Sequence, residues 1–90
     1  MYKVDRTAKF MRELKTMVKR GLDMSKLDFV VGTLASGKQL PAKYRDHALK
    51  GNWRGIRECH VESDWLLLYK IEAKVLVLTL HRTGTHSDLF

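Results

Sequence analysis

The chain has 90 residues, a length at which a protein folds around one small core, and we expect a single domain over residues 1–90. Lys and Arg number 17 against 10 Asp and Glu, and the net charge of +7 favours an anionic partner such as nucleic acid, an anionic membrane surface or an acidic protein. The longest apolar runs, such as WLLLY and VLVLTL, are too short to cross a bilayer, no signal peptide pattern is present and the single cysteine excludes an internal disulfide. We therefore expect a cytoplasmic protein without a membrane partner.

The first half of the chain has the apolar spacing of two helices, preceded by YKV as a possible short strand. Thr7 is a candidate N-cap, and apolar residues then recur at helical spacing until Gly21. Ser25 and Asp28 have the spacing of a capping box, which opens a second amphipathic helix that Gly37 ends. Because the link between them is short, we expect an antiparallel helical hairpin. The expected core positions are Phe10, Met11, Leu14, Met17 and Val18, then Leu27, Val30, Val31 and Leu34.

The second half, after Pro41, has the pattern of strands. HALKG is a weak short strand, and GIRECHV, DWLLLYKIE and VLVLTLHR are stronger ones with short connections, which favours antiparallel pairing. The third of these strands alternates two apolar sets and should be central: Trp65, Leu67, Tyr69 and Ile71 against Leu66 and Leu68. The sequence predicts an α+β fold, in which an N-terminal short strand and a two-helix hairpin pack on one face of a curved, mostly antiparallel sheet.

Four histidines lie in this second half: His47, His60, His81 and His86. None forms a helical i, i+4 pair with another and no cysteine pair accompanies them, so we predict neither a metal nor another cofactor. The last segment, HRTGTHSDLF, has no clear helix or strand pattern. Burial of Phe90 would hold such a tail in place, and the alternative is that its ring stacks on a base of a nucleic acid. His81 is a strand residue without an assigned role.

The strand GIRECHV alternates between two faces, with Ile56, Glu58 and His60 on one and Arg57, Cys59 and Val61 on the other. If Cys59 and Val61 face the helices, Cys59 is a small core residue and His60 faces outward. Asp64 follows at the start of the next strand, close enough across a short turn to pair with His60 and move protons near neutral pH. The alternative is a turn aspartate beside a surface histidine.

This set of side chains fits the cleavage of RNA without a metal. The ribose 2′-hydroxyl becomes a nucleophile once a base removes its proton, and an acid and cations complete the site. DNA has no 2′-hydroxyl and would not be cut in this way.

Two segments, LPAKYRDHALKGNWRGIRECHVESDWLLLYK and RTGTHSDLF, resemble the YafQ branch of the RelE/ParE superfamily, the toxins of bacterial type II toxin-antitoxin pairs. The resemblance runs from Leu40 to Phe90 and rests on the spaced elements DH.L.G.W.G.R, H...DW.L.Y and RTG.H..LF; before Leu40 only the strand and two-helix layout with its basic surface is similar. It implies a RelE-like toxin domain, an endoribonuclease that cuts messenger RNA in the decoding site of the ribosome, with the ribosome, messenger RNA and a cognate antitoxin as partners.

The resemblance also implies roles for individual residues. The matches to the family's active-site positions are His47, His60, Asp64, His86 and Phe90, and Trp65 and Arg82 are flanking candidates for RNA binding. We predict that Asp64 and His60 activate the 2′-hydroxyl, that His86 protonates the 5′-oxygen, and that His47 with Arg82 steadies the phosphate. On the first helix, the basic residues opposite the apolar arc are expected to contact ribosomal RNA: Arg12, Lys15 and Lys19.

Two other functions fit the chain: a ParE-like gyrase-inhibiting toxin, and a non-catalytic RNA-binding domain whose histidines only contact phosphate. The histidines and the aspartate argue against the gyrase inhibitor, because binding alone needs no proton transfer.

Overall fold

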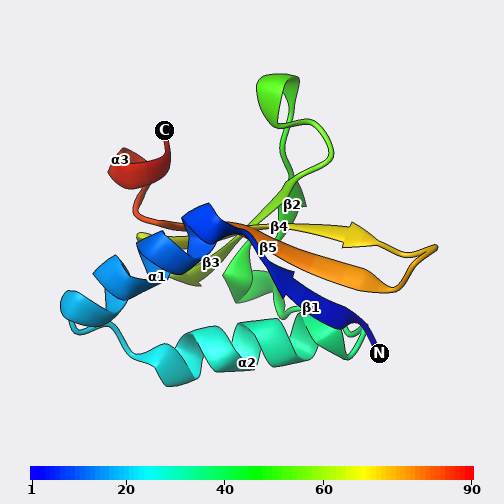
Figure 1. Ribbon diagram of the computed structural model, residues 1–90, viewed down its shortest axis with the longest axis horizontal. Coiled ribbons are helices and arrows are strands. Elements are labelled where there is room, and N and C mark those ends of the chain that lie inside the picture. The colour runs from blue at the N-terminus through cyan, green and yellow to red at the C-terminus, as the bar shows by residue number, and fades with distance from the viewer.

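The computed structural model describes residues 1–90 and has the predicted α+β architecture (Figure 1). A five-stranded sheet has the order β1-β5-β4-β3-β2. None of the helices combines the length and the apolar composition needed to cross a membrane. In chain order the elements are β1 (Lys3–Arg6), α1 (Ala8–Lys19), α2 (Met24–Ala35), the 3-10 helix η1 (Ala42–Tyr44), β2 (His47–Ala48), the 3-10 helix η2 (Gly51–Trp53), β3 (Arg57–Glu62), β4 (Trp65–Glu72), β5 (Val77–Gly84) and α3 (His86–Leu89).

The sheet is mostly antiparallel, as predicted, with β4 in the centre. Strands β2 to β5 pair antiparallel with their neighbours. The exception is β1, which pairs in parallel with β5 from Lys3 opposite Val77 to Arg6 opposite Leu80. A parallel neighbour requires a crossover connection, and the chain supplies it with the two helices and the rest of the sheet.

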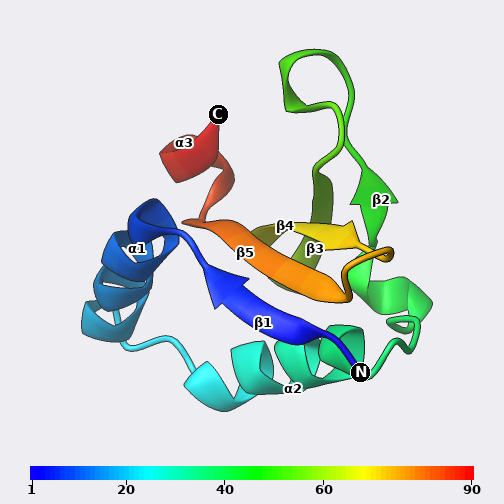
Figure 2. The same cartoon turned by 45° about the vertical axis from the view of Figure 1, so that its right-hand side comes forward.

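Helices α1 and α2 lie on one face of the sheet (Figures 1 and 2). Helix α1 packs chiefly on β5, and α2 contacts β3. The predicted alternation in β4 is confirmed, because Trp65, Leu67 and Tyr69 face these helices. The main core consists of Phe10, Met17, Leu27, Val30, Leu34, Cys59, Val61, Trp65, Leu67, Tyr69, Leu78 and Leu80.

The opposite face of the sheet carries a second, smaller cluster. Leu66 and Leu68 of β4 pack there against Leu89 of α3, with Leu49, Trp53 and Ile56 at the margin. Helix α3 and the β2–β3 connection project from the sheet on this side, away from α1 and α2 (Figures 1 and 2).

The ends of the two long helices are fixed by capping residues and by glycines. Thr7 is the N-cap of α1, as predicted, and its hydroxyl accepts a hydrogen bond from the backbone N–H of Phe10. Helix α2 begins earlier than the Ser25 capping box would place it, because Asp23 is the N-cap and accepts hydrogen bonds from both the backbone N–H and the hydroxyl of Ser25. Gly21 and Gly37 follow the two helices with positive φ angles of 81° and 77°.

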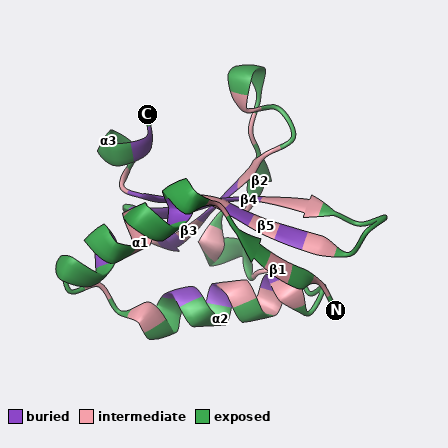
Figure 3. Cartoon of the chain, in the orientation of Figure 1, coloured by how far each residue is buried: buried purple, intermediate pink, exposed green.

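Two residues of the predicted apolar arc on α1 are exposed. Phe10 and Met17 are buried, whereas Met11 and Val18 are exposed. Most of the α1 ribbon is accordingly coloured as exposed in Figure 3. Each exposed residue follows a buried one and is therefore rotated by about 100° around the helix axis. The arc that contacts β5 is narrower than predicted.

Candidate active site

Imidazoles and carboxylates gather on the face of β3 that α1 and α2 do not cover. His60 faces outward as predicted, because its neighbours Cys59 and Val61 belong to the main core. His47 comes from β2 beside it, Asp64 from the β3–β4 turn and His86 from the start of α3. The sheet and the short helix therefore bring together four of the five predicted active-site residues.

Glu58 is the buried centre of this cluster and was not predicted as a site residue. Its Oε1 atom lies 3.5 Å from His47 Nε2 and 3.6 Å from His60 Nε2. Its side chain is only 7% exposed. The strand alternation already placed Glu58 on the outward face with His60, and this was the signal that could have identified it.

The ring of His47 is held in a defined orientation. Its Nδ1 lies 2.6 Å from the carbonyl oxygen of Arg45. Since a carbonyl oxygen only accepts, Nδ1 carries the proton and Nε2 faces Glu58. The adjacent Asp46 anchors this segment, because its Oδ1 accepts hydrogen bonds from Tyr69 Oη at 2.5 Å and from Arg57 Nε at 3.2 Å.

Asp64 pairs with His86 and not with His60, which corrects the predicted pair. Its Oδ1 accepts one hydrogen bond from the backbone N–H of His86 at 3.0 Å and another from the ring Nδ1 at 2.7 Å. These two bonds, the backbone one first, lower the pKa of Asp64. His60 Nδ1 instead lies 3.2 Å from the carbonyl oxygen of Ser63. A bulge between His60 and Glu62 interrupts the β3–β4 pairing, so the simple hairpin spacing does not hold through the turn.

The segment that contains His86 is a short helix and not an irregular tail. Thr85 is its N-cap and forms a capping box with Asp88. Arg20, at the end of α1, donates two hydrogen bonds to the Asp88 carboxylate, at 2.7 and 3.2 Å. The Arg20 guanidinium first, and then Thr85, keep the pKa of Asp88 well below its usual range. This ion pair connects α1 to α3.

Leu89, and not Phe90, is the buried anchor of this segment. Leu89 packs against Leu66 and Leu68, whereas Phe90 is 56% exposed. The ring of Phe90 meets the ring of Trp53 edge to face, with 5.6 Å between centroids. The prediction that Phe90 holds the tail by burial is therefore wrong, and its ring is accessible for stacking on a base.

His60 and His86 face each other across a small gap, with 5.7 Å between their ring centroids. Each of these two imidazoles lies beside a different carboxylate: Glu58, which also lies beside His47, is next to His60, and Asp64 is next to His86. One ligand atom from each of Glu58, His60 and His86 can be chosen so that all lie within 4.8 Å of one another. This set has the residue types and the spacing of a metal site, which no pair spacing in the sequence indicated.

The two flanking candidates, Arg82 and Trp65, bond to other side chains within the protein. Arg82 forms a bidentate ion pair with Glu13 of α1, with Nε and NH2 at 2.8 and 2.6 Å from the carboxylate oxygens. This pair raises the pKa of Arg82 and ties α1 to β5. Trp65 is 2% exposed and its indole N–H donates to the hydroxyl of Thr83 at 2.9 Å. Trp65 is therefore a buried core residue, and the Arg82 guanidinium is paired with a carboxylate of α1.

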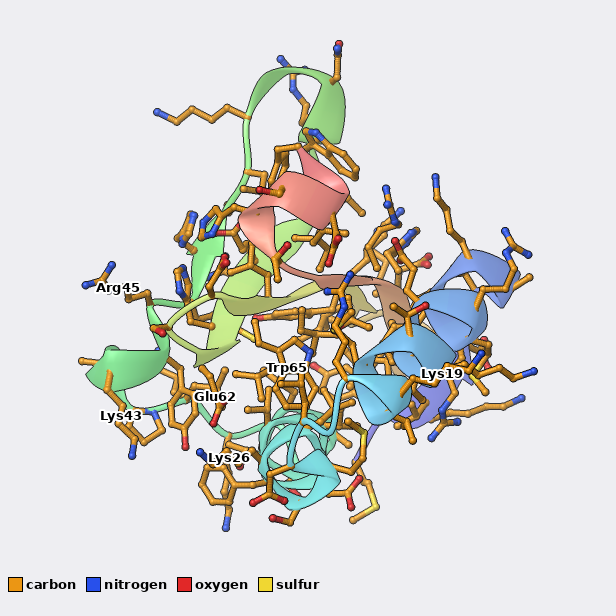
Figure 4. All side chains as sticks on the ribbon, turned by 90° about the vertical axis from the view of Figure 1, so that its left-hand side faces the viewer. Lys19, Lys26, Lys43, Arg45, Glu62 and Trp65 are labelled. Atoms are coloured by element: carbon orange, nitrogen blue, oxygen red, sulfur yellow. The ribbon has the colours of Figure 1, made fainter.

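Three other sequence predictions concern residues outside the cluster. Burial raises the pKa of the Cys59 thiol, which agrees with its prediction as a small core residue and not a nucleophile. Burial, and then the charge of Lys70, lower the pKa of His81, which takes no part in the cluster. The basic residues Arg12, Lys15 and Lys19 are exposed on α1 and form no ion pairs, and Figure 4 shows Lys19 on the helix surface.

The amino-acid sequence is similar to known bacterial toxins. A family described as the bacterial toxin of type II toxin-antitoxin systems, YafQ, matches residues 2–90. The mRNA interferase toxin YafQ of Escherichia coli K12 is 41% identical over 88 residues, which cover 97% of this chain and 94% of the relative.

Two solved structures extend the comparison to the fold. The toxin in the crystal structure of the E. coli DinJ-YafQ complex superposes with a TM-score of 0.91 at 38% identity, over 100% of this chain and 99% of that one. A metal-bound toxin from Helicobacter pylori superposes with a TM-score of 0.94 at 44% identity, over the whole of both chains.

Proposed function

Because the chain belongs to the YafQ family of toxins from bacterial type II toxin-antitoxin systems, we propose that it is an mRNA interferase that cuts messenger RNA by acid-base catalysis on the ribosome. The observation that carries this proposal is the facing pair of imidazoles. His60 and His86 lie across one gap and each is supported by a different carboxylate. Such an arrangement can accept a proton on one side of a phosphate and deliver one on the other.

His60 is the proposed general base. Its Nδ1 donates to the carbonyl oxygen of Ser63, which leaves the lone pair of Nε2 for the proton of the 2′-hydroxyl. The 2′-oxygen then attacks the phosphorus, and Glu58 stabilises the imidazolium that forms. In this proposal Glu58, and not Asp64, is the carboxylate that supports His60 in the activation of the 2′-hydroxyl.

His86 is the proposed general acid. The Asp64 carboxylate accepts from its Nδ1, fixes the ring and stabilises its protonated form, so that Nε2 can donate its proton to the departing 5′-oxygen. The products of this step are a 2′,3′-cyclic phosphate and a 5′-hydroxyl. His47 is assigned to the phosphate in its imidazolium form, in which Nδ1 donates to the carbonyl oxygen of Arg45 and Nε2, beside Glu58, also carries a proton.

The proposed partners follow from the charge and from the relatives. A net charge of +7 favours an anionic partner, and we assign ribosomal RNA to the exposed residues Arg12, Lys15 and Lys19 of α1. A related E. coli toxin has been crystallised with DinJ in a toxin-antitoxin complex, so the proposed protein partner of this chain is a cognate antitoxin. The cytoplasm, where ribosomes translate, is the proposed place of action.

Cleavage of a defined message tests the proposal. The purified protein is incubated with programmed ribosomes and a short message, and new 5′ ends are mapped; a message with 2′-deoxyribose at the mapped position is the control. We expect cleavage of the ribose message that persists in EDTA, and none of the deoxy control. A gyrase inhibitor or a non-catalytic RNA-binding domain would leave both messages intact.

A metal ion would compete with this chemistry. Glu58, His60 and His86 together fit a divalent ion, and a metal-bound toxin from H. pylori is among the related structures. A bound ion would occupy the imidazole nitrogens that the proton transfers require. We therefore assign it an inhibitory role at this site.

A further inference from the structure

A hollow of about 660 Å³ opens beside His60, outside the cluster of catalytic candidates. It lies between α2, η1 and the β3–β4 turn, and Figure 4 shows Lys26 and Glu62 on one side with Lys43 and Arg45 on the η1 side. Its volume is in the range of sites that hold a small organic ligand. The residues that matter for its chemistry are Lys26, Lys43, Tyr44, Arg45, His60 and Glu62.

The hollow carries a net positive charge, because only one of its three basic side chains is paired with a carboxylate. Lys26 forms an ion pair with Glu62. Lys43 and Arg45 form no ion pair; the Nζ atom of Lys43 lies 5.3 Å from the centroid of the Tyr44 ring. Two cations are therefore available for an anionic ligand, and a half-buried aromatic ring forms the adjacent wall.

Arg45 connects the hollow to the catalytic cluster through its backbone. Its φ angle of 49° is in the left-handed region, which is uncommon for a residue with a side chain. In this conformation its carbonyl oxygen receives the Nδ1 hydrogen bond of His47, while its side chain lines the hollow. Backbone strain of this kind concentrates at functional sites.

We propose that this hollow binds the nucleotide next to the scissile phosphate, with Lys43 and Arg45 bound to the phosphate of that nucleotide. The inference rests on the proposed function, because an RNA strand cut beside His60 has to continue across the adjoining surface. His60 belongs both to the cluster and to the wall of the hollow, so the two sites are contiguous. Phosphate contacts from Lys and Arg fix the register of a nucleic acid without reading its sequence.

The test removes the two cations without disturbing the backbone. In the double variant Lys43→Gln/Arg45→Gly, glycine accommodates the positive φ angle, so the carbonyl that holds His47 stays in place. The control variant Lys9→Gln/Lys74→Gln removes the same charge at two exposed positions outside the hollow.

Binding is measured by NMR titration of the ¹⁵N-labelled protein with a 2′-O-methyl trinucleotide, which cannot be cleaved at its 2′-oxygen. In the wild type the amides of residues 43–45 and 60–63 should shift. In the double variant the affinity should fall about tenfold, and the slope of log K against log salt should become shallower by about 0.7, because one phosphate loses its contact with the protein. The control should bind like the wild type apart from a small loss common to both variants.

Equal affinity of the double variant and the control would overturn the inference, as would shifts that avoid the hollow in the wild type. If the double variant instead loses affinity for the cognate antitoxin and binds the trinucleotide like the control, the hollow is an antitoxin surface and the inference is wrong. The proposed function fails separately, when the wild type leaves ribosome-bound message intact whatever the titration shows.

Discussion

The Asp64 carboxylate accepts hydrogen bonds from both the backbone N–H and the ring Nδ1 of His86. One side chain from the β3–β4 turn therefore fixes the position and the orientation of a histidine on α3. The two residues are adjacent only in the folded protein. Asp64 therefore acts through His86 and is a positioning residue in the proposed mechanism.

Asp64→Asn should reduce cleavage of ribosome-bound message by about 10²-fold, because the protonated form of His86 loses its counter-charge. Single-turnover rates measure the change. Asp28→Asn, an exposed carboxylate outside the cluster, is the matched control and should cleave normally. Combining Asp64→Asn with His86→Ala should cost little more than His86→Ala alone, and a fully additive double variant would contradict this coupling.

Leu89→Ala and Phe90→Ala should separate anchoring from RNA contact. Leu89 is buried against β4, so its truncation should lower the free energy of unfolding by about 2 kcal/mol and reduce cleavage by undocking α3. Phe90 is exposed, so Phe90→Ala should preserve stability and weaken message binding by about 1–3 kcal/mol if its ring stacks on a base. Chemical denaturation measures the loss of stability and cleavage rates measure the loss of RNA contact. If the Phe90→Ala protein cleaves like the wild type, Phe90 does not stack on the message.

The Arg20–Asp88 ion pair should make stability depend on acid pH. The pKa of Asp88 is lower in the folded protein than the value of about 3.9 expected in the unfolded chain, so the ionised carboxylate stabilises the fold above that pH. As the pH falls below about 4, the unfolded chain takes up the proton first and this contribution is lost. The difference in melting temperature between the wild type and Asp88→Asn should therefore be constant near neutral pH and shrink in acid. A difference that persists unchanged at about pH 2 would contradict the assignment.

The triple variant Arg12→Glu/Lys15→Glu/Lys19→Glu should weaken binding to ribosomes and make it less sensitive to salt, because fewer phosphate contacts remain to be screened. Sedimentation of the protein with ribosomes at several salt concentrations measures both effects. The control Lys3→Glu/Lys38→Glu/Lys74→Glu changes the net charge equally at exposed positions outside α1. If the two triple variants bind alike, the effect comes from net charge and α1 is not the contact surface.

Zn²⁺ or Cu²⁺ should inhibit cleavage, and EDTA should restore it, because an ion held by Glu58, His60 and His86 blocks the imidazole nitrogens. Isothermal titration with Zn²⁺ should give one site per chain that Glu58→Gln weakens at least about tenfold. Activation by the ion, or inhibition unaffected by Glu58→Gln, would exclude this role.

Local patterns predicted the parts of the fold that depend on sequence neighbours. The period of two placed Cys59 and Val61 in the core and His60 outside, and the two apolar faces of β4 identified the central strand. Thr7 was recognisable as an N-cap because its hydroxyl bonds to a residue three positions later. These interactions can be predicted from the sequence because both partners lie within one turn or one strand.

Long-range pairings could not be predicted in the same way. Charge alone does not say which carboxylate lies beside which cation, so Arg82 was assigned to phosphate although it binds Glu13. Trp65 was given a possible RNA contact, whereas its indole fills the core and bonds to Thr83. The parallel pairing of β1 with β5 and the Asp64–His86 bond likewise arise only when distant elements pack together.

The parallel contact between β1 and β5 also determines when the protein can fold during its synthesis. The strand of residues 3–6 can pair only after residues 77–80 have been synthesised. Arg20 can likewise form its ion pair only after Asp88 has been synthesised. A nascent chain arrested after residue 76 lacks β5, the strand on which α1 packs, and should remain open to proteases. Under the proposed function, the ribosome that makes this enzyme does not meet a complete catalytic site until His86 has left the exit tunnel.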